Sequence, residues 1–165
     1  MNWLSGVHAA LTACSPADKL ALVAALPEVP EDFVHPGAPA ADPRIPGRPQ
    51  RPELVHPSSV PRRSLGSERG RAALVHAVAH IEFNAINLAL DAIHRFPGMP
   101  RDYYADWVSV ARDEARHHAL LVERLNELGH TYGDLPAHNG LWEAAEKTAH
   151  DVLVRMALVP RVLEA

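Results

Sequence analysis

The chain has 165 residues, a length that suits one domain with a substantial core. Its net charge of −4 and pI near 6.2 exclude a generally basic nucleic-acid binder, and the single cysteine, Cys14, excludes an internal disulfide framework. No uninterrupted apolar run reaches transmembrane length, and the N-terminus lacks the basic-then-apolar order of a secretory signal. We therefore expect a cytoplasmic protein with no membrane partner.

Residues 1–26 predict one amphipathic helix, which Ser15 would cap and in which Pro16 would take the first position. Residues 27–63 differ in character, because ten of the chain's 15 prolines lie there and no helical or strand period survives. We expect this segment to be an extended arm, either loose or wrapped along the helices.

Residues 64–165 are helical in pattern, and their first long helix is expected to run from a cap at Ser64 or Ser67 to about Phe96. Projected at about 100° per residue, its apolar stripe is centred on Glu82. The opposite face carries polar residues, so the histidine pair on it is interpreted as solvated rather than as a metal site. These residues are His76, His80, Asn84, Asn87 and Asp91.

A second helix is expected from about Asp102 to Leu128 and to end at Gly129, a good helix terminator. Its apolar stripe contains Trp107 and Glu114. His117 lies three residues on and projects from the same face, while His118 is expected to pack nearby. The turn around Gly98 places Glu114 and His117 level with Glu82. Because carboxylates buried at one level are costly without a cation, we expect Glu82, Glu114 and His117 to bind a metal.

A third helix is expected to start near Leu141, with Trp142 and Met156 in its apolar stripe and a kink at Pro160. Three residues on its flank are candidates for a further metal ligand, and spacing alone does not choose among them. They are Glu146, His150 and Glu164.

Several runs of residues resemble an uncharacterised bacterial family of ferritin-like proteins, a domain of unknown function that is similar in turn to di-iron tRNA-modifying hydroxylases. The resemblance covers roughly residues 52–165. It is carried by Arg62-Arg63-Ser64-Leu65-Gly66-Ser67, His80-Ile81-Glu82, Glu114-Ala115-Arg116-His117-His118 and the stretch from 132 to 165. It implies that Glu82, Glu114 and His117 are iron ligands, and that Glu164, followed by Ala165, is the third-helix ligand.

The resemblance also implies an all-α fold, a ferritin-like four-helix bundle, of which this chain holds three core helices. A fourth helix with a second Glu-x-x-His motif would follow residue 165, so the domain at 64–165 is expected to be C-terminally truncated. An apolar groove beside Glu82, Glu114 and His117 would then be open. A second copy of the chain could complete the bundle as a homodimer.

The expected function is that of a di-iron carboxylate protein, a non-haem oxidoreductase of the hydroxylase type when complete. Manganese satisfies the same ligands as iron. A nucleic-acid partner, tRNA, is suggested by the family analogy alone. Two other functions remain open, namely an iron-handling or ferroxidase protein and a metal-free helical scaffold with a buried Glu/His network.

Overall fold

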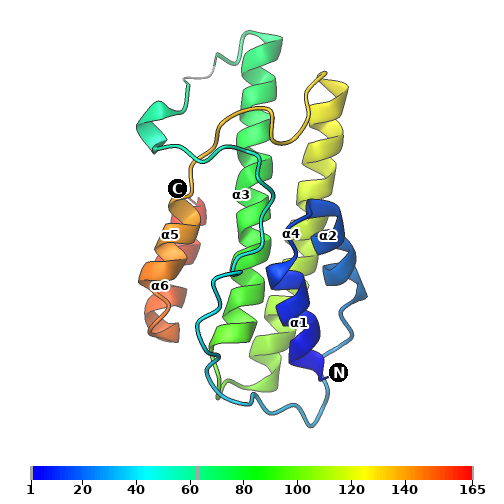
Figure 1. Cartoon of the computed structure of the whole chain (residues 1–165), viewed down its shortest axis with the longest axis vertical. Coiled ribbons are helices and arrows are strands. Elements are labelled where there is room, and N and C mark those ends of the chain that lie inside the picture. The colour runs from blue at the N-terminus through cyan, green and yellow to red at the C-terminus, as the bar shows by residue number, and fades with distance from the viewer. Residues whose placement is uncertain (1, 62–63, 165) are drawn as a thin grey trace.

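The computed structural model describes residues 2–61 and 64–164, with side chains described as far as Val159. This part of the chain forms six α-helices, one short 3-10 helix (η1, Pro57–Ser59) and no β-strand, so the prediction of an all-α fold is confirmed. The helices are shown in Figure 1 and are α1 (Trp3–Thr12), α2 (Pro16–Ala25), α3 (Glu68–Arg95), α4 (Arg101–Glu127), α5 (Gly140–Lys147) and α6 (Val152–Glu164).

The centre of the fold is an antiparallel hairpin of the two long helices, α3 and α4, with α1 and α2 on one side and α5 and α6 on the other (Figure 1). The Tyr104 hydroxyl donates to the carbonyl oxygen of Phe96 (2.9 Å) and accepts from the amide of Met99 (3.3 Å). The neighbouring Tyr103 hydroxyl donates to the carbonyl oxygen of Ala92 (3.1 Å). These bonds fix the turn and therefore the register of the hairpin.

The caps of the long helices are largely those expected from the sequence. The Ser67 hydroxyl accepts the amide of Gly70 at the start of α3 (3.0 Å). At the end of α4, the amide of His130 donates to the carbonyl oxygen of Leu125 and Gly129 has a φ of +80°. A left-handed glycine with this bonding is a common helix C-terminus, so Gly129 ends the helix as predicted.

The N-terminal segment contains two helices rather than the one predicted. The Ser15 cap of α2 is confirmed, since its hydroxyl accepts the amide of Asp18 (3.3 Å). The missed helix is α1, which is capped by the side chain of Asn2 on the amide of Ser5 (2.8 Å). Its buried residues pack with α3 and α4 in the main core; they are Trp3, Leu4, Val7, Ala10 and Leu11.

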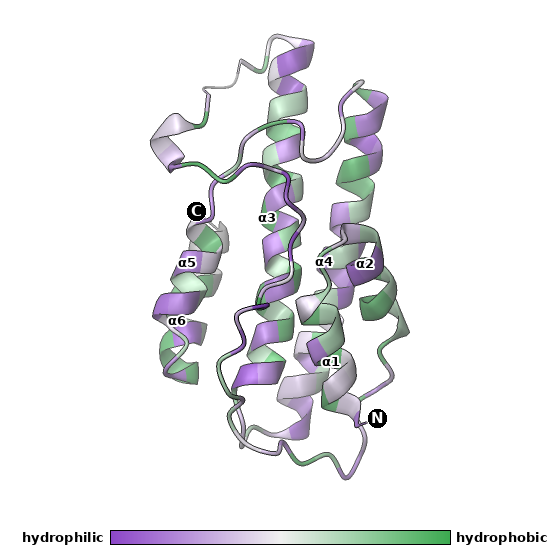
Figure 2. Ribbon diagram, in the orientation of Figure 1, coloured by the Kyte–Doolittle hydropathy of each residue, from purple (hydrophilic) through white to green (hydrophobic). Residues whose placement is uncertain are grey.

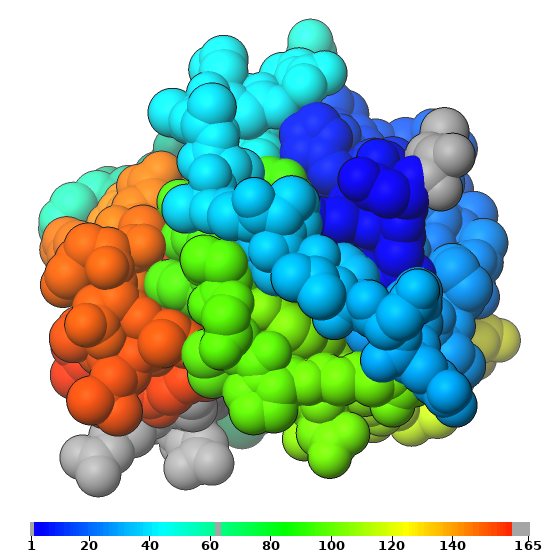
Figure 3. Space-filling model, turned by 90° about the horizontal axis from the view of Figure 1, so that it is seen from below, coloured from blue at the N-terminus to red at the C-terminus, as the bar shows by residue number. Residues whose placement is uncertain are grey.

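The proline-rich arm is wrapped along the helices rather than loose. The amide of Gly47 donates to the carbonyl oxygen of Leu11 (2.8 Å), and a Cβ at residue 47 would clash with the Thr12 carbonyl oxygen. Further along, Leu54 and Ala137 form an isolated parallel bridge with the connection after α4. Seen from below, the arm crosses the molecule between α1 and the end of the α3–α4 hairpin (Figure 3).

The polar face of α3 is buried, so the prediction of a solvated histidine face is wrong. His76 and His80 are 1% and 7% exposed. The amide of Gly133 donates to His76 Nε2 (3.0 Å), and the Tyr132 hydroxyl lies 3.0 Å from His80 Nδ1. Helix periodicity cannot reveal this burial, because the covering segments are not helical. Figure 2 shows the hydrophilic residues distributed along α3 among hydrophobic ones.

The third predicted helix is broken at 148–151, between α5 and α6, rather than at Pro160. The Asp151 side chain accepts the amide of Val154 (3.0 Å) and so caps a new helix. The α6 helix then continues past residue 160 to Glu164. Trp142 is buried as expected, whereas Trp107 is only partly buried.

A buried ion pair fastens α5 and α6 to α3. Arg155 Nη1 donates to Asp91 Oδ2 (2.8 Å), and both side chains are almost fully buried. The same guanidinium donates through Nε to the Thr148 hydroxyl (2.8 Å) and through Nη2 to the carbonyl oxygen of Ala145. Arg95 supplies Asp91 with a second guanidinium from the next turn of α3 (2.8 Å). The buried charges are thus paired and hydrogen-bonded, as burial requires.

Of the helices in the described ranges, α3 alone is long and apolar enough to cross a membrane. This judgement rests on length and composition only, and 61% of the 18-residue apolar stretch of the helix is buried inside the structure. The core helix of a soluble protein passes the same test, so the observation is weak support for a membrane span.

Replacing Asp91 with alanine tests the ion pair. The change leaves Arg155 buried without its carboxylate, and we expect the free energy of unfolding to fall by about 3–5 kcal/mol. Asp113→Ala is the matched control, because Asp113 pairs with Arg116 on an exposed surface, where the loss is below about 1 kcal/mol. Urea denaturation measures both, and equal losses would contradict a structural role for the buried pair.

The burial of His94 makes the stability of the folded protein sensitive to acid. Burial lowers the pKa of His94 to about 4, and nearby His8 adds to the effect. The folded protein therefore holds this ring neutral, while the unfolded chain protonates it below about 6.5. We expect stability to decrease as the pH falls from about 6.5 to about 4. Denaturation midpoints across this range check the prediction. A decrease that is equally steep in His94→Gln would contradict it.

Candidate metal centre

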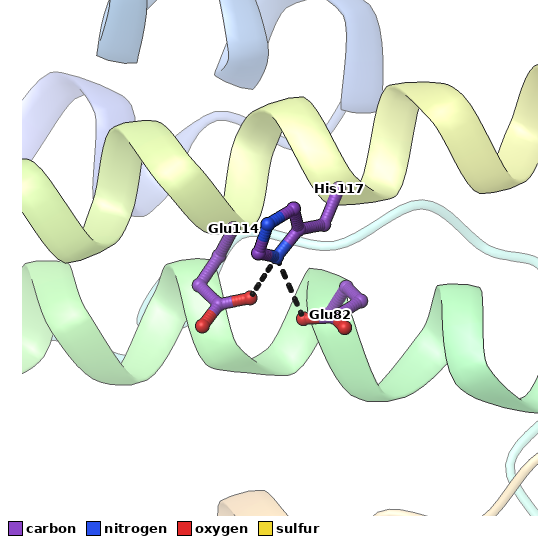
Figure 4. A group of neighbouring side chains, drawn as sticks. All are labelled: Glu82, Glu114 and His117. Carbon is purple, nitrogen blue, oxygen red and sulfur yellow. Dashed lines mark hydrogen bonds and ion pairs between the residues drawn. The ribbon is translucent and has the colours of Figure 1, made fainter.

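Halfway along the hairpin, one side chain of α3 meets two of α4. His117 Nδ1 lies 3.2 Å from Glu114 Oε2 and 4.0 Å from Glu82 Oε2. One ligand atom from each of the three residues lies within 4.8 Å of the others. Figure 4 shows a ring nitrogen of His117 directed between the two carboxylates. The structure thus brings together three of the four residues expected to bind metal.

The three side chains lie at an open rim rather than in the centre of a buried stripe. Their exposed fractions are 21% for Glu82, 22% for Glu114 and 46% for His117. Leu74, an apolar residue of the predicted stripe about two turns before Glu82, is also exposed, by 37%. The predicted stripe on α3 is therefore only partly covered, and the site can be reached from solvent.

The electrostatics of the two carboxyl groups favour a bound cation. Partial burial and the adjacent Glu114 carboxyl raise the pKa of Glu82 to about 8. Two carboxylates this close repel each other when both are ionised, so one holds a proton in the absence of a cation. A divalent metal would replace that proton and the repulsion with two coordinate bonds.

The donor set fits a transition metal. Two carboxylates and one imidazole are hard and borderline ligands that suit iron or manganese. All three reach the site from the α3–α4 hairpin. Glu114 and His117 are held three residues apart on one helix, so their spacing does not depend on loop conformation.

The other predicted candidates are not part of this group. Glu146 and His150 are exposed, and Glu146 accepts a hydrogen bond from Trp142 Nε1 (3.1 Å). Glu164 ends α6, but its side chain lies outside the described residues, as do Arg62, Arg63 and Ala165 of the family resemblance.

His118 is a packing residue, as expected from the sequence. It is 1% exposed, its ring lies 5.5 Å from that of Phe83, and Nδ1 donates to the carbonyl oxygen of Ala79 (2.8 Å). It therefore joins α4 to α3 on the side of the hairpin away from the exposed rim.

Sequence reasoning missed the part that α6 contributes beside Glu114. Arg155, Met156 and Val159 line a small cavity that Glu114 also lines. Met156 stood in the predicted stripe, which was a usable signal. Arg155 did not, because a charged residue is not expected on a core-facing position unless its partner, Asp91, is known to be buried.

The chain belongs to a family described as proteins of unknown function (DUF455), which matches residues 12–165. The expected membership of an uncharacterised family is thereby confirmed. An uncharacterised protein of Haemophilus influenzae is 54% identical over 124 residues, which are 71% of this chain and 43% of the relative. The chain thus spans less than half the length of that relative. No solved structure matches the chain significantly.

The carboxylate pair predicts a pH response in metal-free protein. Because the pKa of Glu82 is about 8 instead of near 4.5, the folded state holds a proton that the unfolded state releases. We expect the free energy of unfolding to fall as the pH rises from about 4.5 to about 8. The Glu82→Gln variant should lack this pH dependence. Denaturation midpoints in the presence of a chelator check this. The control is Glu123→Gln, an exposed residue of α4. An unchanged slope in Glu82→Gln would contradict the carboxyl pair.

Proposed function

We propose that this protein binds a transition metal through Glu82, Glu114 and His117 and uses it for oxidation–reduction chemistry. The observation that carries the proposal is the convergence of two carboxylates and an imidazole within 4.8 Å, from two helices whose register is fixed. Two adjacent carboxyl groups that share a single histidine repel each other when both are ionised, and a bound cation would remove that repulsion.

The ligand types favour iron, with manganese as the other metal that suits them. A redox-active metal bound there would supply the electron transfer that none of the side chains at the site can perform. Glu82 and Glu114 would balance its charge. The Glu114 carboxylate would also orient the His117 ring through the contact of 3.2 Å.

The ligand set corresponds to half of a bundle di-metal site. Such sites take a lone Glu from each of two helices and a Glu-x-x-His motif from each of the other two. The hairpin provides one of each, in Glu82 and the Glu114–His117 motif. This match supports a ferritin-like, hydroxylase-type di-iron centre, in which the remaining ligands would come from Glu164 or from a second copy of the chain.

A metal-free network is the second candidate. It is favoured by the contact between His117 Nδ1 and Glu114 Oε2, which satisfies both groups in the absence of a metal. The two functions differ in their response to chelators, because a network of hydrogen bonds keeps its stability when metal is removed.

Metal content per chain tests the proposal. Protein incubated with Fe²⁺ or Mn²⁺ and then desalted is expected to retain about one ion per chain, since the three ligands form one site. The variant Glu114→Ala/His117→Ala should retain none. A thermal melt of the loaded protein should move to lower temperature when a chelator is added.

A matched control lies at the end of the same helix. Glu127 and His130 have the same spacing, and Glu127 forms an exposed pair with Arg124. Glu127→Ala/His130→Ala should bind as much metal as the unaltered chain. Absence of metal from the unaltered chain would overturn the proposal, and so would equal retention by the Glu114→Ala/His117→Ala variant.

A further inference from the structure

A second cavity lies where the end of the proline-rich arm, the beginning of α3 and the connection after α4 meet (Figure 1). Its volume is about 220 Å³. One water molecule needs roughly 10–15 Å³, and typical ligand pockets have roughly 300–1,000 Å³, so the cavity suits a small organic molecule. It is separate from the candidate metal centre, because Glu82 projects about 120° around α3 from the cavity residue His76.

The segment beside the cavity is basic, although the whole chain has a net charge of −4. Four arginines and one glutamate lie between residues 61 and 71. Among them, Arg69 lines the cavity, is exposed and forms no ion pair with any residue that the structure describes. Its guanidinium is therefore available to an anion.

The beginning of α3 adds hydrogen-bond donors at the same place. The Ser67 hydroxyl, which lines the cavity, accepts the amide of Gly70 (3.0 Å). The amides of Glu68 and Arg69 have no acceptor within the described ranges, and they lie at the positive end of the helix dipole. Ser64 brings a further hydroxyl to the lining.

A buried histidine provides an independent indication that a ligand binds here. His76 lines the cavity seven residues after Arg69, on the same face of α3, and is only 1% exposed. Its Nε2 accepts the amide of Gly133 (3.0 Å), and burial lowers the pKa of His76, so the ring is neutral with its proton on Nδ1. No described residue accepts that proton. A buried donor without an acceptor is costly, and a molecule in the cavity can supply the acceptor.

The lining distinguishes two parts of a ligand. A guanidinium, free amides at a helix N-terminus and hydroxyl groups are typical partners of a phosphate, which offers more terminal oxygens than a carboxylate does. The walls that the arm and the connection contribute are apolar and suit an organic group. They consist of Val60, Pro61, Leu135 and Pro136.

We propose that this cavity binds a small organic phosphate monoester, with its phosphate beside Arg69 and the start of α3. Its organic group lies against the apolar walls, and an acceptor atom of the ligand takes the Nδ1 proton of His76. The ligand contacts three segments that are far apart in the sequence, and so it holds the end of the arm on α3. The binding requires no metal and does not depend on the proposed redox function.

Binding of phenyl phosphate tests this site. The full chain is freed of metal by a chelator, because phosphate would otherwise bind a metal ion at Glu82, and its histidine rings are labelled with ¹⁵N. We expect saturable binding by calorimetry and a change in the ring signals of His76, which the His76→Gln variant identifies. Phenyl phosphate should bind more tightly than inorganic phosphate, which lacks the apolar group, and more tightly than benzoate, which lacks the phosphate.

Two arginine variants form a matched pair. Arg69→Gln changes an exposed side chain, so the fold is retained, and should weaken the binding of phenyl phosphate by about tenfold. Arg71→Gln removes the same charge two residues further on, where the guanidinium donates to the carbonyl oxygen of Leu65 (3.3 Å), and should weaken it by less than about twofold. Ala73→Leu fills the cavity from the α3 side and should abolish the binding, with circular dichroism as the check on its helix content.

The outcomes separate this site from general attraction to a basic surface and from the metal centre. Equal affinities of Arg69→Gln and Arg71→Gln, or binding that leaves the His76 ring signals unchanged, would overturn the site. Benzoate binding as tight as that of phenyl phosphate would overturn the assignment to a phosphate. The Glu114→Ala/His117→Ala variant should bind phenyl phosphate like the unaltered chain, so the two proposals can fail separately.

Discussion

The register of the α3–α4 hairpin determines which side chains meet, because the turn between the helices is held by two tyrosine hydroxyls. Tyr104 bonds both ends of the turn and Tyr103 bonds the last turn of α3. With this register fixed, Glu82 lies level with Glu114 and His117. A shift of one residue along either helix would rotate these side chains by about 100° and separate them. The chemistry of the site therefore depends on packing and hydrogen bonds at the end of the hairpin.

The rest of the fold stabilises α3 on the faces that the site does not use. The arm and the connection after α4 cover its histidines and asparagines, and the pair of Arg155 with Asp91 fastens α5 and α6. The exposed side is the one that bears Glu82 and His117. This division explains how a pair of carboxyl groups is tolerated, because solvent reaches them, while the buried Asp91 carboxylate is paired with Arg155.

The sequence predicted the two long helices, a cap at either Ser64 or Ser67, the end at Gly129 and the approach of Glu82 to Glu114 and His117. The helices and their ends depend on local sequence. The approach of the three side chains follows from their equal distances, in residues, from the turn that joins the two helices. It did not predict that His76 and His80 are buried, because the covering segments have no periodic pattern. It placed the break in the third helix at Pro160 rather than near Asp151, because the proline was a stronger signal than a side-chain cap. The relation of Arg155 to Asp91 spans 64 residues and has no local signature.

The most direct test of the account is anomalous diffraction from crystals of the chain grown with Mn²⁺. We predict one strong anomalous peak between the Glu82 and Glu114 carboxylates, within coordination distance of a His117 ring nitrogen. Absence of a peak there, or a peak confined to other surface carboxylates, would contradict the claim that this hairpin is built around a metal.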